Sequence, residues 1–124
     1  MPSPSGRDAR FRVVFDDAMF AEDLDHSAPG GRIAAQNERD TLIKDGLPPE
    51  RLKACEAEGR DGTGLPGCAK VYIPEPDGPW GMVFELRIDE NETPYMACLA
   101  FGPRHPTGPG ALSVYEVADR RLNI

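Results

Sequence analysis

Hydrophobic residues alternate with polar residues most clearly in the C-terminal half of the chain. In Trp80–Asp89 the large apolar residues fall at every second position, which predicts a β-strand with one face in the core. A polar turn, Asp89–Thr93, joins it to Pro94–Phe101, whose apolar residues leave neither face polar and so predict a strand in the middle of a sheet. Ala69–Pro74 predicts a shorter strand before them. The residues expected on the core face of the first strand are Trp80, Met82, Phe84, Leu86 and Ile88.

The N-terminal half predicts one strand followed by helices. Arg10–Asp16 alternates large and apolar residues as a strand does, and Asp16 with Asp17 can cap a helix over Ala18–Leu24. After the break Ser27–Gly31, the composition of Arg32–Asp45 favours a helix that ends at Gly46. A second helical stretch is predicted over Glu50–Glu58, because the preceding Pro49 suits a first helical turn.

Glycine and proline divide the remaining chain. Four glycines make Gly59–Gly67 a mobile connection, and Gly102–Gly110 is predicted to be a loop before a final strand or short helix over Leu112–Leu122. Residues 1–9 are predicted to be a disordered tail, and residues 10–124 a single domain. The order of strand, two or three helices, antiparallel meander and short C-terminal element predicts an α+β fold.

Composition limits the cellular compartment and the ligands expected for this domain. No apolar run approaches the length of a membrane span, and the N-terminus lacks the apolar core of a signal peptide. Three cysteines without CxxC spacing predict a reducing cytoplasm and no disulfide framework, with Cys98 as a buried thiol. Two histidines and scattered cysteines predict no metal site. The net charge of −7 argues against broad, nonspecific binding of nucleic acid.

The C-terminal residues resemble a known family. The run from Leu99 to His105 contains Gly-Pro-Arg after an apolar strand, and Ser113–Leu122 reads Ser-Val-Tyr-Glu-Val-Ala-Asp-Arg-Arg-Leu. This arrangement is similar to the RelE/ParE superfamily of bacterial type II toxins, in which a Gly-x-Arg turn precedes Val-Tyr-x-x-Ala-x-x-Arg-Leu. The resemblance implies a RelE-like α+β fold and a small cognate antitoxin as partner. It also implies one of two activities: metal-independent cleavage of messenger RNA on the ribosome without a cofactor, or inhibition of DNA gyrase without cleavage.

The resemblance also implies roles for individual residues. Arg104 would clamp the phosphate, since a guanidinium offers two parallel donors. Tyr115 would serve in proton transfer or base stacking, and Lys70 matches basic residues that the family carries on the preceding strand. His105 lies beside Arg104 and is a candidate acid or base. Further RNA contacts are assigned to basic residues near this segment: Arg87, Arg120 and Arg121.

Each of these residues also has a purely structural interpretation. Arg104 can be a solvated turn residue, His105 a loop histidine and Tyr115 a half-buried core residue. Lys70 can protect a strand edge from aggregation. Arg87 can pair with a neighbouring glutamate, and the last two arginines can complement a helix C-terminus.

The sequence departs from the pattern of the catalytic relatives in two respects. Gly81 stands where those relatives carry an arginine, and Val71 and Tyr72 follow Lys70 where a second basic residue is expected. The acidic net charge also differs from that of ribosome-directed members. Three functions therefore stay open: an endoribonuclease toxin, a non-catalytic toxin that binds a protein such as gyrase, and a non-toxic binding module.

Overall fold

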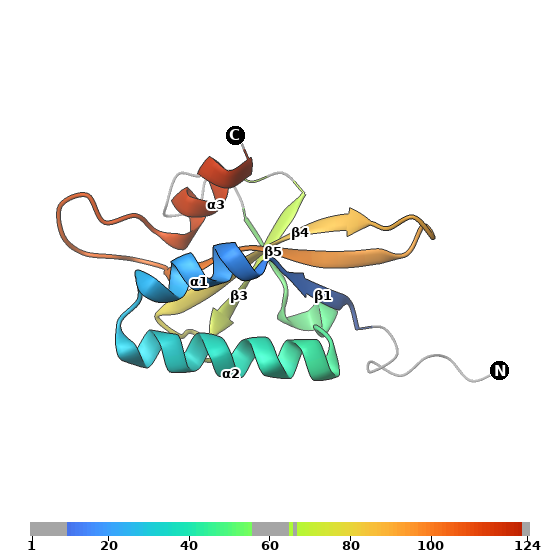
Figure 1. The fold of residues 1–124 in the computed structure, drawn as a ribbon, viewed down its shortest axis with the longest axis horizontal. Coiled ribbons are helices and arrows are strands. Elements are labelled where there is room, and N and C mark those ends of the chain that lie inside the picture. The colour runs from blue at the N-terminus through green and yellow to red at the C-terminus, as the bar shows by residue number, and fades with distance from the viewer. Residues whose placement is uncertain (1–9, 56–64, 66, 123–124) are drawn as a thin grey trace.

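The protein folds into an α+β domain, as predicted. The computed structural model describes residues 10–55, 65 and 67–122; the predicted tail and most of the predicted 59–67 connection lie outside this part. A five-stranded sheet has helices on both faces, with α1 and α2 on one and α3 on the other (Figure 1). The elements are β1 (Arg12–Phe15), α1 (Asp17–Asp25), α2 (Pro29–Asp45), the short 3-10 helix η1 (Pro49–Arg51), β2 (Lys53–Ala54), β3 (Cys68–Ile73), β4 (Trp80–Ile88), β5 (Pro94–Pro103) and α3 (Val114–Leu122).

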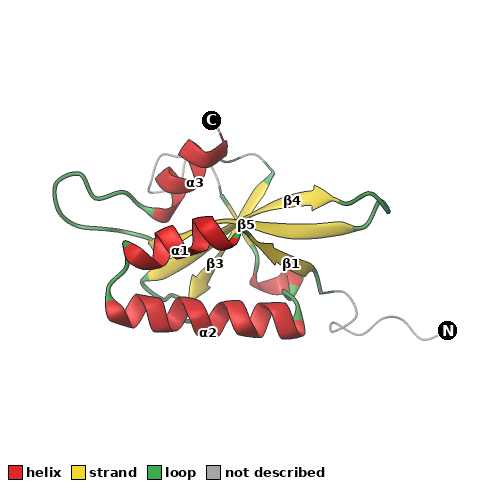
Figure 2. Cartoon of the chain, in the orientation of Figure 1, coloured by secondary structure: helices red, strands yellow, loops and turns green. Residues whose placement is uncertain are grey.

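The strand order across the sheet is β1-β5-β4-β3-β2. Figure 2 shows the strands in yellow and the helices that pack on the sheet in red. β1 runs parallel to β5, while the other neighbours are antiparallel. A register shift between Val83 and Phe84 marks a β-bulge in the β4–β5 pair. β5 lies between β1 and β4, and its residues 96–102 are buried, which confirms that this apolar run is an internal strand.

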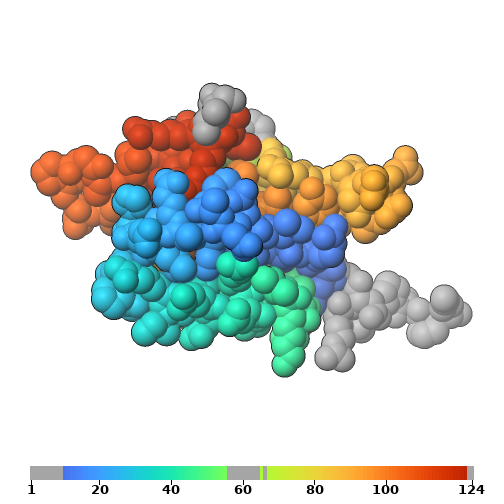
Figure 3. Space-filling view, in the orientation of Figure 1, coloured from blue at the N-terminus to red at the C-terminus, as the bar shows by residue number. Residues whose placement is uncertain are grey.

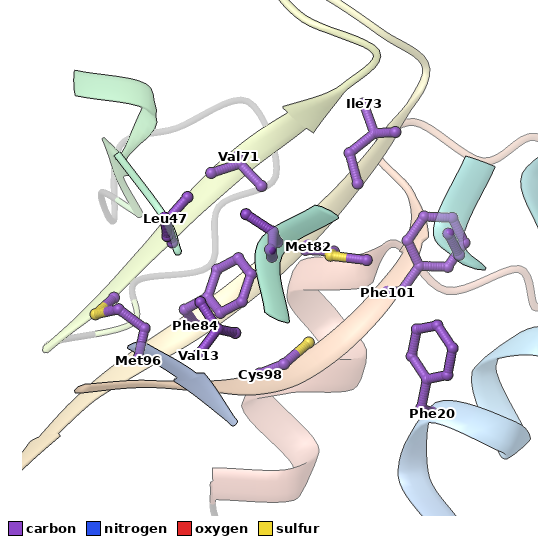
Figure 4. Close-up of a cluster of buried hydrophobic side chains, with 12 residues drawn as sticks. Val13, Phe20, Leu47, Val71, Ile73, Met82, Phe84, Met96, Cys98 and Phe101 are labelled. Atoms are coloured by element: carbon purple, nitrogen blue, oxygen red, sulfur yellow. The ribbon is translucent and has the colours of Figure 1, made fainter. Parts of the chain in front are cut away.

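Two apolar clusters fill the two faces of the sheet. The cluster beneath α1 and α2 includes Val71, Met82 and Phe84, all fully buried (Figure 4). The space-filling view shows both helices covering this face (Figure 3). The opposite cluster, beneath α3, is smaller and includes Val83 and Val114. The face beneath α3 therefore leaves room for polar side chains beside a small core.

Several predicted helix boundaries are confirmed. The side chain of Asp16 accepts a hydrogen bond from the Met19 amide at 3.0 Å and so caps α1. α2 ends before Gly46, whose φ of 79° lies in the left-handed region that favours glycine. The predicted start of α2 was three residues late, because Pro29 occupies the first helical turn, where its missing N–H costs nothing.

The helix predicted over Glu50–Glu58 was wrong in its described part. η1 is a single turn, and Leu52 then turns to extended backbone at φ −74° and ψ 131°. β2 follows at once and pairs with β3, so backbone hydrogen bonding to the sheet edge replaces helical bonding. Arg51 fixes this turn, since its guanidinium pairs with Glu38 of α2.

Two further predictions are corrected by the structure. Leu86 and Ile88 are 50% and 67% exposed, because neither α1 nor α2 covers the far end of the β4–β5 hairpin. The last element, predicted as a strand or helix, is a helix. Its start has a capping box: the Glu116 amide donates to the Ser113 hydroxyl and the Ser113 amide donates to the Glu116 carboxylate, both at 3.2 Å.

Candidate functional site

Two glycines let side chains approach the sheet closely on its α3 face. Tyr72 of β3 pairs with Gly81 of β4, and Gly81 pairs with Gly102 of β5, so the three residues form a row across three strands. A Cβ atom on Gly81 would lie 3.3 Å from Cγ of Arg104 and 3.6 Å from Cγ1 of Val114. The absence of a side chain at Gly81 therefore lets the arginine stem lie close to the sheet.

Arg104 lies along this row with its guanidinium over Tyr72. Its Cζ is 3.6 Å from the centroid of the Tyr72 ring, a close cation–π contact. Its Nη1 donates to the Gly78 carbonyl at 2.9 Å, and its backbone amide donates to the Pro79 carbonyl, also at 2.9 Å. Its Nε is buried and has no hydrogen-bond partner in the described part of the chain. The ring and the carbonyl thus hold the guanidinium in one orientation.

Tyr115 and Lys70 approach the same place from α3 and β3. Tyr115 lies in the first turn of α3 and is only 3% exposed. The Lys70 ammonium lies 4.8 Å from the centroid of the Tyr115 ring and 5.7 Å from that of Tyr72. The structure therefore brings together three residues that the resemblance singled out: Lys70, Arg104 and Tyr115.

Lys53 and Tyr72 were missed as site residues. Lys53 of β2 pairs directly with Lys70 of β3, and its ammonium lies 5.2 Å from the centroid of the Tyr72 ring. It was missed because the sequence predicted a helix there, which gives no cross-strand neighbour. The second cation expected beside Lys70 along β3 is thus supplied from the adjacent strand. We call Lys53, Lys70, Tyr72, Arg104 and Tyr115 the cationic cluster.

The cationic cluster concentrates positive charge on an acidic protein. Its three cations take no part in the ion pairs found among the described residues. Lys53 and Lys70 face each other directly, an arrangement that destabilises a sheet. Only the tyrosine rings offset this repulsion within the cluster. A group of cations without ion pairs to other described residues is suited to an anionic ligand.

Burial keeps the Tyr115 hydroxyl protonated. Burial raises the pKa of Tyr115 above its usual value of 10.0, and the neighbouring Arg104 and Lys70 only partly oppose this shift. The hydroxyl is therefore a proton or hydrogen-bond donor at neutral pH rather than a base. Base stacking on the Tyr115 ring is also restricted, because the residue is 3% exposed.

The remaining predicted residues are not members of the cationic cluster. His105 follows Arg104 in an exposed loop. Arg87 lies six residues beyond Gly81 on β4, about 20 Å along the strand, and its Nε is 2.8 Å from Oε1 of Glu85. Arg120 is exposed on α3.

Arg121 has a structural partner in Asp23 of α1. Its Nη2 lies 2.8 Å from Oδ1 of Asp23 and its Nη1 lies 2.9 Å from Oδ2, a bidentate pair. Nη1 also donates to the Leu99 carbonyl at 2.6 Å, and Oδ2 of Asp23 accepts from the Phe101 amide at 2.9 Å. The pair thus satisfies the Leu99 carbonyl and the Phe101 amide of β5, which lie beyond the residues that pair with β1. It also links α3 to α1. The Arg121 guanidinium is committed to this contact.

Two structural features are absent from the described residues. No helix within them is long and apolar enough to cross a membrane. They contain no group of three or more histidine, cysteine, aspartate or glutamate side chains arranged to hold a metal ion.

Comparisons of the chain with protein-family models, curated proteins and solved structures give no match. The residues of the cationic cluster and the resemblance of the C-terminal motifs therefore remain as the indications of function.

Proposed function

We propose that the protein is a toxin of the RelE/ParE type that cleaves messenger RNA in the cytoplasm without a metal ion. The observation that carries this proposal is the convergence of Lys70, Arg104 and Tyr115. Lys70 and Arg104 lie over the ring of Tyr72, and Lys70 also lies over the ring of Tyr115. In this proposal the cationic cluster holds a phosphodiester of single-stranded RNA, and a small antitoxin covers the cluster in the resting cell.

A cation from another part of the fold lies beside each of the two positions that depart from the catalytic pattern. The stem of Arg104 fills the space that a side chain at Gly81 would take, and Lys53 stands opposite Lys70. Both positions that lack an expected basic residue thus lie beside a cation from another element. This arrangement supports a phosphate-binding site in spite of the acidic net charge.

The proposed reaction is attack of a ribose 2′-oxygen on the adjacent phosphorus, with cleavage of the bond from phosphorus to the 5′-oxygen. Arg104 and the two lysines stabilise charge on the phosphate. Tyr115, protonated at neutral pH, donates a proton to the leaving 5′-oxygen. His105 is the residue proposed to accept the proton of the 2′-hydroxyl, since no carboxylate belongs to the cluster.

A second candidate function is binding without cleavage. The burial of Tyr115 and the engagement of Nη1 of Arg104 by Gly78 both favour it, because each restricts access to a catalytic group. The target would be a protein such as DNA gyrase for a toxin, or an anionic partner for a non-toxic module.

Induction of the protein in bacterial cells, with mapping of transcript ends, tests the proposal. We expect growth arrest with new 5′ ends for the wild type. Arg104→Ala should reduce cleavage by about 10²–10³-fold, as expected for removal of one oriented donor. Arg87→Ala is the matched control, because that arginine is exposed and pairs with Glu85 away from the cluster.

The other outcomes separate the alternatives. Growth arrest with intact transcripts would contradict cleavage and support a protein target. Harmless expression in several hosts would support the non-toxic module.

A further inference from the structure

Two cysteines adjoin the last residue pair at the edge of the sheet next to the cationic cluster. β2 and β3 pair Lys53 with Lys70 and Ala54 with Ala69, and Cys55 and Cys68 extend from the Ala54–Ala69 pair in the same direction. The Cys55 carbonyl accepts from the Leu65 amide at 3.3 Å and the Cys68 amide donates to the Leu65 carbonyl at 3.1 Å, so Leu65 links the two main chains there. Both cysteines are partly buried and pack against the same apolar cluster beneath α3. Their side chains therefore lie on one face of the sheet.

The position of the two cysteines brings them within reach of a covalent bond. Each directly adjoins one member of the Ala54–Ala69 pair, and paired residues of antiparallel strands have Cα atoms about 4.5 or 5.5 Å apart. Disulfides span Cα distances of about 4.4–6.8 Å. Cys98 belongs to the cluster on the other face of the sheet and is not a competing partner.

We propose that Cys55 and Cys68 form a reversible cross-strand disulfide that fastens β2 to β3 beside the cationic cluster. The oxidant is a low-molecular-weight disulfide such as glutathione disulfide. One cysteine thiolate attacks it, which breaks its S–S bond and releases one glutathione thiolate. The second cysteine thiolate attacks the protein sulfur of this mixed disulfide and releases the second glutathione. Two electrons pass from the protein to glutathione, and the two cysteine protons end on the two glutathione thiols.

The disulfide would affect the cationic cluster because β2, which carries Lys53, is a very short strand. This edge strand has two residues, and it carries Lys53 opposite a like charge. Each cysteine is two positions from one of these lysines, on the same face of its strand. The disulfide would hold the two ammonium groups side by side against their repulsion. This effect on RNA contact rests on the proposed function, whereas formation of the disulfide does not.

The environment of Cys68 makes closure slow. Burial raises the pKa of Cys68 from 9.0 to about 11, and the charge of Glu85 adds to this shift. The thiolate fraction at neutral pH is therefore small, so the pair has to be measured at equilibrium rather than after a brief exposure.

The test uses the full chain with Cys98→Ala, equilibrated in mixtures of reduced and oxidised glutathione. Intact mass should show the loss of two hydrogen atoms, and trypsin should release peptide 54–60 linked to peptide 61–70. We expect the melting temperature to rise by roughly 10 °C on oxidation. Neither change should occur in the matched variants that also carry Cys55→Ser or Cys68→Ser.

Glutathione adducts or intermolecular disulfides without the linked peptides would overturn the proposal. A fluorescent single-stranded RNA oligonucleotide reports on the cluster in the same samples. We expect it to bind severalfold more tightly to the oxidised protein. Equal affinity in both states would overturn the coupling to the cluster but not the disulfide, and absence of binding in both states would count against the proposed function alone.

Discussion

At the scale of single residues, Gly81 decides where the guanidinium of Arg104 lies. A side chain at this position would press on the stem of Arg104 and on the Val71 carbonyl, each 3.3 Å from the Cβ position. The strand itself tolerates alanine, so the effect of a substitution should be local. In the sequence, Gly81 showed only the loss of an expected arginine. In the structure, its missing side chain also leaves the space in which the stem of Arg104 lies.

Gly81→Ala should weaken binding of single-stranded RNA by about tenfold, because it displaces the guanidinium from Tyr72 by a fraction of an ångström. Fluorescence anisotropy with a labelled oligonucleotide measures the change. Gly102→Ala is the control, since its Cβ would meet Val114 at 3.7 Å, an ordinary contact. Equal affinities for the two variants would show that the missing side chain at Gly81 does not position Arg104.

The sequence predicted part of this site and missed the rest for a clear reason. Arg104, Tyr115 and Lys70 could be identified because the motif places them by order along the chain. Lys53 and Tyr72 could not, because their roles depend on the pairing of β2 with β3 and of β3 with β4. Cross-strand neighbours are set by register, and composition alone did not reveal that Lys53 lies in a strand.

At the scale of elements, the Asp23–Arg121 pair positions α3, which carries Tyr115. Their side chains are only 8% and 12% exposed, so the charges are largely removed from water. Asp23 raises the pKa of Arg121 above its usual value, so this arginine stays charged. Loss of either partner would leave an unpaired charge near the core.

Asp23→Ala should lower the free energy of unfolding by about 3 kcal/mol, because it also leaves the Phe101 amide without its acceptor. Urea unfolding followed by Trp80 fluorescence measures this. Glu22→Ala removes a 65% exposed carboxylate 3.7 Å from Arg121 and should change stability by less than about 0.5 kcal/mol. If both variants retained wild-type stability, the pair would not be what holds α3.

Helices and strands were predicted correctly where the local sequence pattern favoured the same structure as the tertiary contacts. The prediction failed where pairing with the sheet overrode the local pattern. The alternation in Trp80–Asp89 and the cap at Asp16 both matched the structure. The segment after Pro49 has helix-favouring composition, but the exposed edge of β3 offered it backbone partners instead. The Ser113–Glu116 capping box was present in the sequence and would have identified the last element as a helix.

At the scale of the whole molecule, the buried thiol of Cys98 sets an alkaline limit on stability. Burial raises the pKa of Cys98 from 9.0 to about 12, with a contribution from the charge of Asp23. The folded state therefore keeps a proton that the unfolded state loses. The stabilisation is complete below pH 9 and is lost as the pH rises from there toward 12.

Urea unfolding under reducing conditions from pH 8 to 10.5 should show this loss. Above pH 9 the wild type should lose about 1.4 kcal/mol per pH unit more than Cys98→Ala, since one additional proton is released on unfolding. The alanine variant starts from a lower stability, so the slopes are compared rather than the absolute values. Parallel slopes would mean that the thiol ionises as readily in the folded protein as in the unfolded chain.

The pairing of the first strand with the last has a consequence for synthesis on the ribosome. β1 can join the sheet only through β5, and Arg12 pairs with Tyr95. Such a distant contact forms late, because the intervening chain has to be made and ordered first. Arg104 and Tyr115 are made later still, so an unfinished chain lacks both the complete sheet and two of the residues proposed to act on RNA. A nascent copy should therefore be harmless to the ribosome that is making it.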